Sequence, residues 1–180
     1  MKDFFTLTSI CVICSGCFID EIIQPNSVSN NQEVTVHLTV VDNIPETTNP
    51  HKGHISALIP EDWNFISASF TENGNQGSII FSQDWTDSIN ICYPPNNFGQ
   101  NMKWICLISD TGYTYENAIS ISIELNLETG GETGCFQLGY LVTKATPNLI
   151  CSGNMVWAPI SFPHVINVGG SENCDLSQTL

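Results

Sequence analysis

The chain has 180 residues, of which 42% are hydrophobic and 12% are charged. This length suffices for one well-buried core and is short for two independent domains. Eighteen acidic residues stand against four lysines and no arginine, which gives a formal net charge of −14. Such a balance excludes nucleic acid as a partner, because phosphate contacts require lysine and arginine. It also makes an anionic membrane surface repel the folded part of the chain.

The first residues have the pattern of an export signal. An apolar run over 4–14 is too short, at about 11 residues, to span a bilayer and suits a signal peptide. It ends in Cys14-Ser15-Gly16-Cys17, which resembles the bacterial lipobox, where a cysteine after small residues receives lipid and becomes the mature N-terminus. We therefore predict a lipoprotein signal peptide over 1–16 and lipid on Cys17. An ordinary cleaved signal and an uncleaved N-terminal anchor are the alternatives.

Cleavage before Cys17 leaves five further cysteines in the mature chain: Cys92, Cys106, Cys135, Cys151 and Cys174. Because this count is odd, at least one of the five stays free or pairs outside the chain. None of the five has the C-x-x-C spacing of a redox or zinc site. Export permits disulfides, so one or two are expected, but the spacing leaves their connectivity open.

The remaining chain is a series of short strand patterns separated by turns. Strict alternation of apolar and polar residues over 34–40 and 119–127 predicts two strands with one buried and one exposed face. One helical turn is expected over 84–88, and no segment keeps a 3.6-residue apolar period. Further strands are expected at 54–59, 65–70, 76–82, 102–109, 135–143, 156–160 and 164–168.

Eight to ten short strands predict an all-β fold, an immunoglobulin-like or jelly-roll antiparallel β-sandwich. We expect a lipidated acidic tether over 17–21, the sandwich domain over 22–168, and a polar C-terminal tail over 169–180. Trp63, Trp104, Tyr140 and Trp157 lie within strand patterns and are expected in the core.

Several motifs together carry a family resemblance. After the lipoprotein start come Ile23-Gln24-Pro25, Leu58-Ile59-Pro60-Glu61-Asp62-Trp63, Ser109-Asp110-Thr111-Gly112-Tyr113 and Leu138-Gly139-Tyr140. With these motifs the chain resembles, over residues 22–170, an uncharacterised family of surface lipoproteins from Bacteroides-type bacteria. That resemblance implies an N-terminal immunoglobulin-like domain, a lipid anchor in the outer membrane, display at the cell surface and an association with glycan utilisation. It brings no catalytic residues.

The sequence shows no motif that would bring catalytic or metal-binding residues together at one site. Catalysis needs a placed acid, base or nucleophile, and Glu61-Asp62 stands in a turn, where acidic residues are common. His51 and His54 have H-x-x-H spacing but no marked third ligand. No spaced Asp-x-Asp-x-Asp-Gly array indicates calcium. We therefore predict no enzyme, no cofactor and no metal, with a structural Ca²⁺ as the alternative.

Aromatic residues in connections are the candidate ligand-binding features, because flat rings stack on sugars. We expect a binding face where the 82–99 and 110–117 connections, which flank the 102–109 strand, meet at strand ends. The alternative is that these connections lie at opposite ends of that strand. Its stacking surface would be Trp85, Tyr93, Tyr113 and Tyr115, with Asp84, Asn97 and Asp110 as hydrogen-bonding partners. Packing within the fold is the alternative role for these rings.

Three hypotheses of function remain open. The leading one is a non-catalytic interaction domain, tethered to the membrane by lipid, whose partner the sequence does not identify. The second is a glycan-binding accessory lipoprotein of a polysaccharide-utilisation system, and the third is a small surface hydrolase. A neutral glycan or a basic protein would suit the acidic surface, whereas a sulfated or uronic polymer would be repelled.

Overall fold

The computed structural model describes residues 17–97, 101–145, 156–157, 164–170 and 174. The predicted signal peptide over 1–16 lies outside the described residues, as does most of the tail predicted over 169–180. The described part is almost all strand: β1 Cys17–Ile23, β2 Ser27–Val28, β3 Glu33–Asp42, β4 Glu46–His51, β5 Gly53–Pro60, β6 Asn64–Glu72, β7 Asn75–Phe81, β8 Met102–Ser109, β9 Tyr113–Tyr115, β10 Ile119–Glu128, β11 Gly134–Lys144, β12 Val156–Trp157 and β13 His164–Val168. One α-helix, α1 (Gln83–Cys92), and one 3-10 helix, η1 (Pro95–Asn97), complete it.

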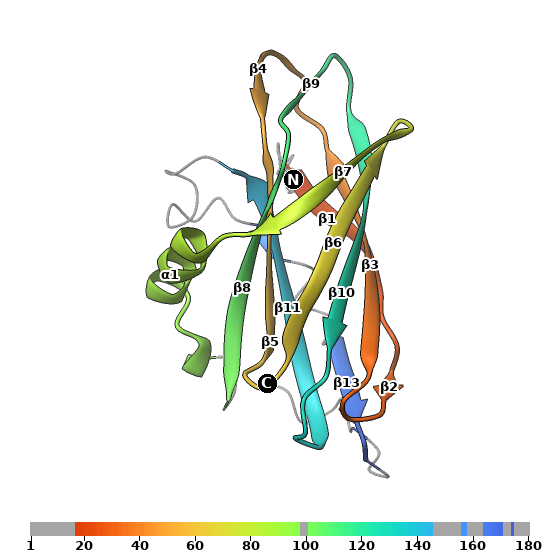
Figure 1. The fold of residues 1–180 in the computed structure, drawn as a ribbon. Helices are drawn as coiled ribbons and strands as arrows, with labels where there is room; N and C mark the ends of the chain where they lie inside the picture. The colour runs from red at the N-terminus through yellow and green to blue at the C-terminus, as the bar shows by residue number, and fades with distance from the viewer. Residues whose placement is uncertain (1–16, 98–100, 146–155, 158–163, 171–173, 175–180) are drawn as a thin grey trace, which may run out of the picture.

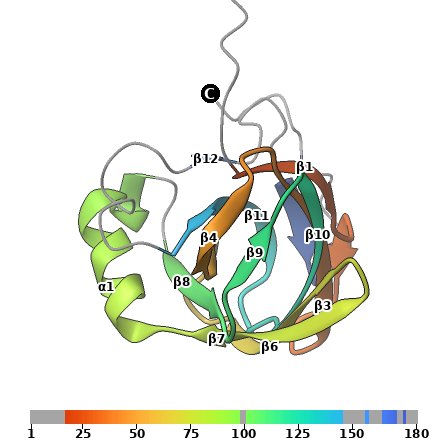
Figure 2. The same ribbon diagram turned by 90° about the horizontal axis from the view of Figure 1, so that it is seen from above.

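The strands form a β-sandwich, which confirms the predicted fold class. Their hydrogen-bonded order is β1-β3-β10-β6-β7-β8-β5-β11-β13-β2, with β4 and β9 as a separate pair at one end (Figure 1). Strand β7 joins the two layers, because its first part pairs with β6 and its last residues pair with β8. We call β1-β3-β10-β6-β7 the first sheet and β8-β5-β11-β13-β2 the second. Seen from above, both curl around a common interior, with α1 outside (Figure 2).

The segment expected as a tether, residues 17–21, instead begins strand β1. Cys17 pairs with Asp42 and Ile23 with His37, so this segment is the edge of the first sheet. Ile19 is buried in the core, which gives the segment the apolar contact that a free tether lacks. Prolines remove a ladder donor, and after Pro25 the chain leaves the first sheet and pairs through β2 with β13 of the second.

The core lies between the sheets and follows the predicted alternation. In β3 the buried apolar residues are Val34, Val36, Leu38 and Val40, and in β10 they are Ile119, Ile123, Leu125 and Leu127, with Ile121 half-buried. The expectation of core positions is confirmed for Trp63, Trp104 and Tyr140. The side chain of Trp157 lies outside the described part. Each large apolar side chain buried in this way stabilises the fold by about 1.5 to 3 kcal/mol.

Helix α1 is longer than the single turn expected over 84–88. It lies on the outer face of the second sheet, where a smaller apolar cluster joins Ile89 to Leu58, Trp104 and Leu141. Strand β5 is therefore buried on both faces, by the core on one side and by the helix on the other. Among the described residues, no helix is both long and apolar enough to cross a membrane.

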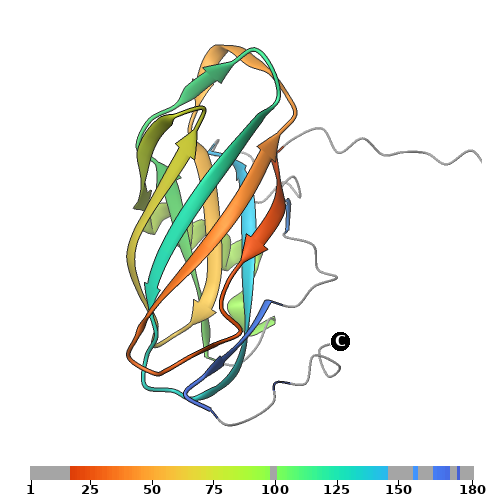
Figure 3. The same ribbon diagram turned by 90° about the vertical axis from the view of Figure 1, so that its right-hand side faces the viewer.

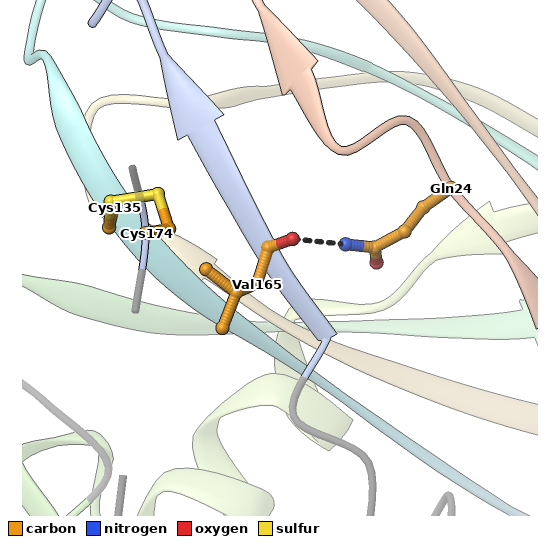
Figure 4. The surroundings of a disulfide bond; sticks show 4 residues. All are labelled: Gln24, Cys135, Val165 and Cys174. Carbon is orange, nitrogen blue, oxygen red and sulfur yellow. Dashed lines mark hydrogen bonds between the residues drawn. A yellow bond between two sulfur atoms is a disulfide. The ribbon is translucent and has the colours of Figure 1, made fainter. Parts of the chain in front are cut away.

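A disulfide fixes part of the tail that the sequence pattern suggested was loose. Cys174 bonds to Cys135 near the start of β11, with their Cα atoms 5.6 Å apart (Figure 4). Beside it, the Gln24 amide donates a hydrogen bond to the Val165 carbonyl of β13 at 3.5 Å. Cys92 is also disulfide-bonded, whereas Cys17 and Cys106 are free thiols.

Candidate functional site

The outward-facing side of the first sheet carries a broad polar groove of about 710 Å³. The strands of this sheet lie side by side in Figure 3, where their common outer face is turned to the viewer. Because successive side chains on a strand point to opposite faces, every second residue of these strands is directed outward. The outward residues of β10, β6 and β7 that line the groove are polar: Ser122, Glu124, Ser69, Thr71, Gln76 and Ser78.

Strand register arranges these side chains in rows across the sheet. In one row Thr39, Ser122, Thr71 and Gln76 stand opposite one another on β3, β10, β6 and β7. In the next row Ile23, His37, Glu124, Ser69 and Ser78 do the same. The rows place hydroxyl, amide, imidazole and carboxylate groups on one surface.

Many of these polar groups are available to a ligand. In the part of the chain that the structure describes, the hydroxyls of Thr39, Thr71 and Ser122 make no hydrogen bond to the protein. Toward the other end of β10, Thr35 donates to Asn126 Oδ1 at 2.7 Å, and Asn126 Nδ2 donates to Glu124 Oε1 at 3.1 Å. The Glu124 end of the groove is thus bonded to Asn126, whereas the row of Thr39, Ser122 and Thr71 keeps its hydroxyls for a ligand.

The four aromatic residues predicted to stack on a ligand belong to different environments. Trp85 and Tyr93 are half-buried against the cluster beneath α1. Tyr113 packs against the main core, with its ring centroid 5.3 Å from that of Phe70. Tyr115 donates a hydrogen bond to the Asp42 carboxylate. None of the four lines the groove.

The predicted hydrogen-bonding partners are also dispersed. Asp84 lies in the first turn of α1 and is exposed. Asp110 is exposed in the turn after β8, where it accepts hydrogen bonds from the Ser78 N–H at 3.2 Å and the Thr111 hydroxyl at 2.9 Å. These bonds lower the pKa of Asp110. Asn97 ends η1, and its side chain lies outside the described part.

A polar cluster closes the end of the sandwich beside β4 and β9. Lys144 Nζ lies 3.6 Å from Asp42 and 3.5 Å from Glu46, and the Cys17 thiol donates to Asp42 at 3.1 Å. Burial alone would raise the pKa of Asp42, but hydrogen bonds from Tyr115, the Ile44 N–H and Cys17, with the Lys144 charge, lower it. Burial and the Asp42 charge raise the pKa of the Cys17 thiol to about 12. The charged and hydrogen-bonding groups of this cluster therefore find their partners within the cluster.

A second polar network lies beneath α1. Ser56 Oγ is 2.7 Å from His54 Nε2 and 2.9 Å from Cys106 Sγ. Serine, histidine and cysteine are residue types of nucleophilic catalysis, but here all three are almost fully buried and the Trp85 ring packs 4.9 Å from that of His54. Burial raises the pKa of Cys106 to about 11, which keeps the thiol protonated. The network stabilises the packing of α1.

The H-x-x-H histidines do not converge on a common ligand. His51 Nε2 lies 3.1 Å from Glu46 Oε2, whereas His54 is buried under α1. Within the described ranges, no three histidine, cysteine, aspartate or glutamate side chains come together in a way that would hold a metal ion.

The alternating pattern indicated which residues of the two strands are polar and face outward, but it did not indicate that they form a groove. The polar positions of the 34–40 and 119–127 alternation face outward, as predicted, but the prediction of a binding face used strand ends instead. Only the pairing of β10 with both β3 and β6 brings Thr39, Ser122 and Thr71 into one row.

Fold and groove together define a β-sandwich domain with a polar sheet face. The chain belongs to the family described as a domain of unknown function (DUF4961), whose model matches residues 68–177. No match to this chain was found among curated proteins.

Three solved structures illustrate the fold similarity. One is AvmM, which catalyses macrocyclization in alchivemycin A biosynthesis (TM-score 0.49, 9% identity, 88% of this chain and 92% of that chain). Another is a cohesin module from a Clostridium perfringens family 33 glycoside hydrolase (TM-score 0.45, 12% identity, 86% and 97%). A third is the cupredoxin domain of amoB from Nitrosocaldus yellowstonii (TM-score 0.44, 11% identity, 86% and 88%).

Proposed function

We propose that this chain is a non-catalytic interaction domain, anchored in the outer membrane by lipid on Cys17 and displayed at the cell surface. Its partner binds in the groove of the first sheet. The observation that carries this proposal is the groove itself, about 710 Å³ lined by outward side chains of neighbouring strands. Strands positioned by a packed core hold such side chains rigidly, which suits the recognition of a partner.

The position of Cys17 supports attachment close to the sandwich. Cys17 is the first residue of β1, an edge strand, and pairs with Asp42. Lipid on this residue would therefore join the first sheet directly, with no intervening tether. It would also bring the end that carries β4 and β9 next to the membrane, because Tyr115 of β9 contacts Asp42.

The variant Cys17→Ser is expected to lose covalent lipid and to leave the membrane fraction. A diacylglyceryl group with a third acyl chain exceeds the two signals that stable attachment requires, and the acidic domain provides no substitute for it. Metabolic labelling with a fatty-acid analogue and fractionation measure both effects. Cys106→Ala, which removes the buried free thiol, is the control and should keep label and location. Labelling that persists in Cys17→Ser would contradict the anchor.

Site-specific crosslinking tests the groove as the partner's site. A photoreactive phenylalanine analogue in place of Ser122 is expected to give a discrete crosslinked product on intact cells, because Ser122 lies within the groove. The same analogue in place of Asn117, exposed between β9 and β10, is the control and should not give that product. If the variant is folded and displayed but the analogue at Ser122 gives no crosslinked product, the result would count against the proposal.

A glycan-binding accessory role is the second candidate function. The free hydroxyls of Thr39, Thr71 and Ser122 and the amide of Gln76 are groups that hydrogen-bond to sugar hydroxyls. The rings of Trp85 and Tyr113, on which stacking would depend, do not line the groove.

A further inference from the structure

We infer that the occupant of the groove is a basic protein segment, an extended peptide with lysine or arginine side chains four residues apart that lies along β10. This inference rests on the proposed function of the groove and specifies the chemistry of its partner. Charge, cross-strand pairing and strand geometry each support it.

The first sheet carries charge of one sign only. Its five strands contain no lysine or arginine and seven acidic residues. Two of these, Asp42 and Glu72, are buried, and the exposed ones are Asp20, Glu21, Glu33, Glu124 and Glu128. The lysines among the described residues lie elsewhere in the fold. Lys103 donates to the Glu61 carbonyl at 2.7 Å, Lys144 pairs with Asp42 and Glu46, and Lys52 lies between β4 and β5. A face of this kind attracts a cationic partner and repels an anionic one.

Two exposed carboxylates face each other across neighbouring strands. Glu33 of β3 stands directly opposite Glu128 of β10. Like charges at opposed positions destabilise a sheet, and no cation of the described chain lies on this sheet to offset the repulsion. The only hydrogen bond to Glu128 among the described side chains comes from the neutral Asn64 amide, at 3.3 Å. A cation supplied by a partner would relieve the repulsion.

Spacing along β10 matches an extended peptide. Glu124 lines the groove, and Glu128 projects from the same face of β10 four residues further along, beyond the residues that line the groove. About 13 Å separates the two carboxylates at the rise of an antiparallel strand. A peptide in the same extended conformation places its residues i and i+4 at that distance. Ser122 and Thr39 lie beyond Glu124 in the same groove, where their free hydroxyls would meet polar groups of the segment.

Peptide titration tests this inference with the full-length protein in a neutral detergent. The probe is a fluorescent nine-residue Ser/Thr peptide with lysine at positions 3 and 7. Replacing both Glu124 and Glu128 with glutamine is expected to weaken binding by about tenfold or more, because two opposed charge pairs are lost. The matched control, Glu116→Gln with Glu132→Gln, removes two exposed charges outside this sheet and should change affinity by less than about threefold.

The outcomes separate this inference from the proposed function. Equal weakening of peptide binding in both double variants would overturn the inference. The peptide would then respond to the net charge of the protein alone. Equal affinity for a peptide whose lysines are adjacent would overturn the i and i+4 geometry. Binding of maltohexaose, lost in Ser122→Trp, without binding of the lysine peptide would refute the basic occupant and leave the groove as a binding site. Failure of every probe together with no crosslink from Ser122 would refute both.

Discussion

Acidification from pH 6.5 to about pH 3 is expected to lower the free energy of unfolding by about 3 to 5 kcal/mol through one buried histidine. His54 is 3% exposed, and burial lowers its pKa from 6.5 to about 3. The unfolded chain therefore binds a proton over this range that the folded chain does not. Stability is fully present above pH 6.5 and is lost as the pH falls toward about 3. Urea unfolding at a series of pH values measures the slope of the free energy of unfolding against pH.

The variant His54→Asn should have a shallower slope than the wild type, whatever its stability at neutral pH. His37→Asn, at an exposed position on the first sheet, is the matched control and should keep the wild-type slope. Burial lowers the pKa of His164 as well, so part of the slope will remain in His54→Asn. Identical slopes for wild type and His54→Asn would show that the native network tolerates a charged imidazole.

Loss of the Cys135–Cys174 disulfide is expected to cost about 4 kcal/mol of stability in the chain-entropy account of loop closure. The bond closes a segment of 39 residues that contains β13. Without it, the unfolded chain gains conformations that the folded chain does not. Denaturant unfolding of Cys174→Ser measures the change, and reductant is avoided because Cys92 is also disulfide-bonded.

A double-variant comparison separates the cross-link from the side chains. Cys135→Ser and Cys174→Ser should destabilise the protein by similar amounts, and the protein with both changes should be no less stable than either. Additive losses would mean that each cysteine acts through its own packing, and the bond would then contribute little.

Local alternation predicted the best-defined strands. The patterns over 34–40 and 119–127 lie within β3 and β10, because a two-residue period with one buried face specifies both strand and orientation. The segment over 17–21 forms part of a strand although Asp20 and Glu21 give it the acidic composition of a tether. In the fold, the apolar residues on either side of them, Ile19 and Ile22, hold the strand against the core.

Features that depend on distant pairing could not be predicted. Helix α1 buries only Thr86 and Ile89, too few to give a helical apolar period. The groove requires β10 to lie between β3 and β6, and sequence spacing does not determine which strands become neighbours. The rings of the predicted aromatic site lie in different clusters for the same reason, because closeness to a strand end does not determine against which layer a ring packs.

The switch of the first segment from one sheet to the other has a consequence for the order of folding. Strand β1 pairs with β3, its near neighbour in the sequence, whereas β2 pairs with the distant β13, and Gln24 and Val165 are 141 residues apart. Long-range closures are slow because the loop entropy is spent before the contacts form. The second sheet is therefore completed only when β13 is in place, and until then β2 has no strand to pair with.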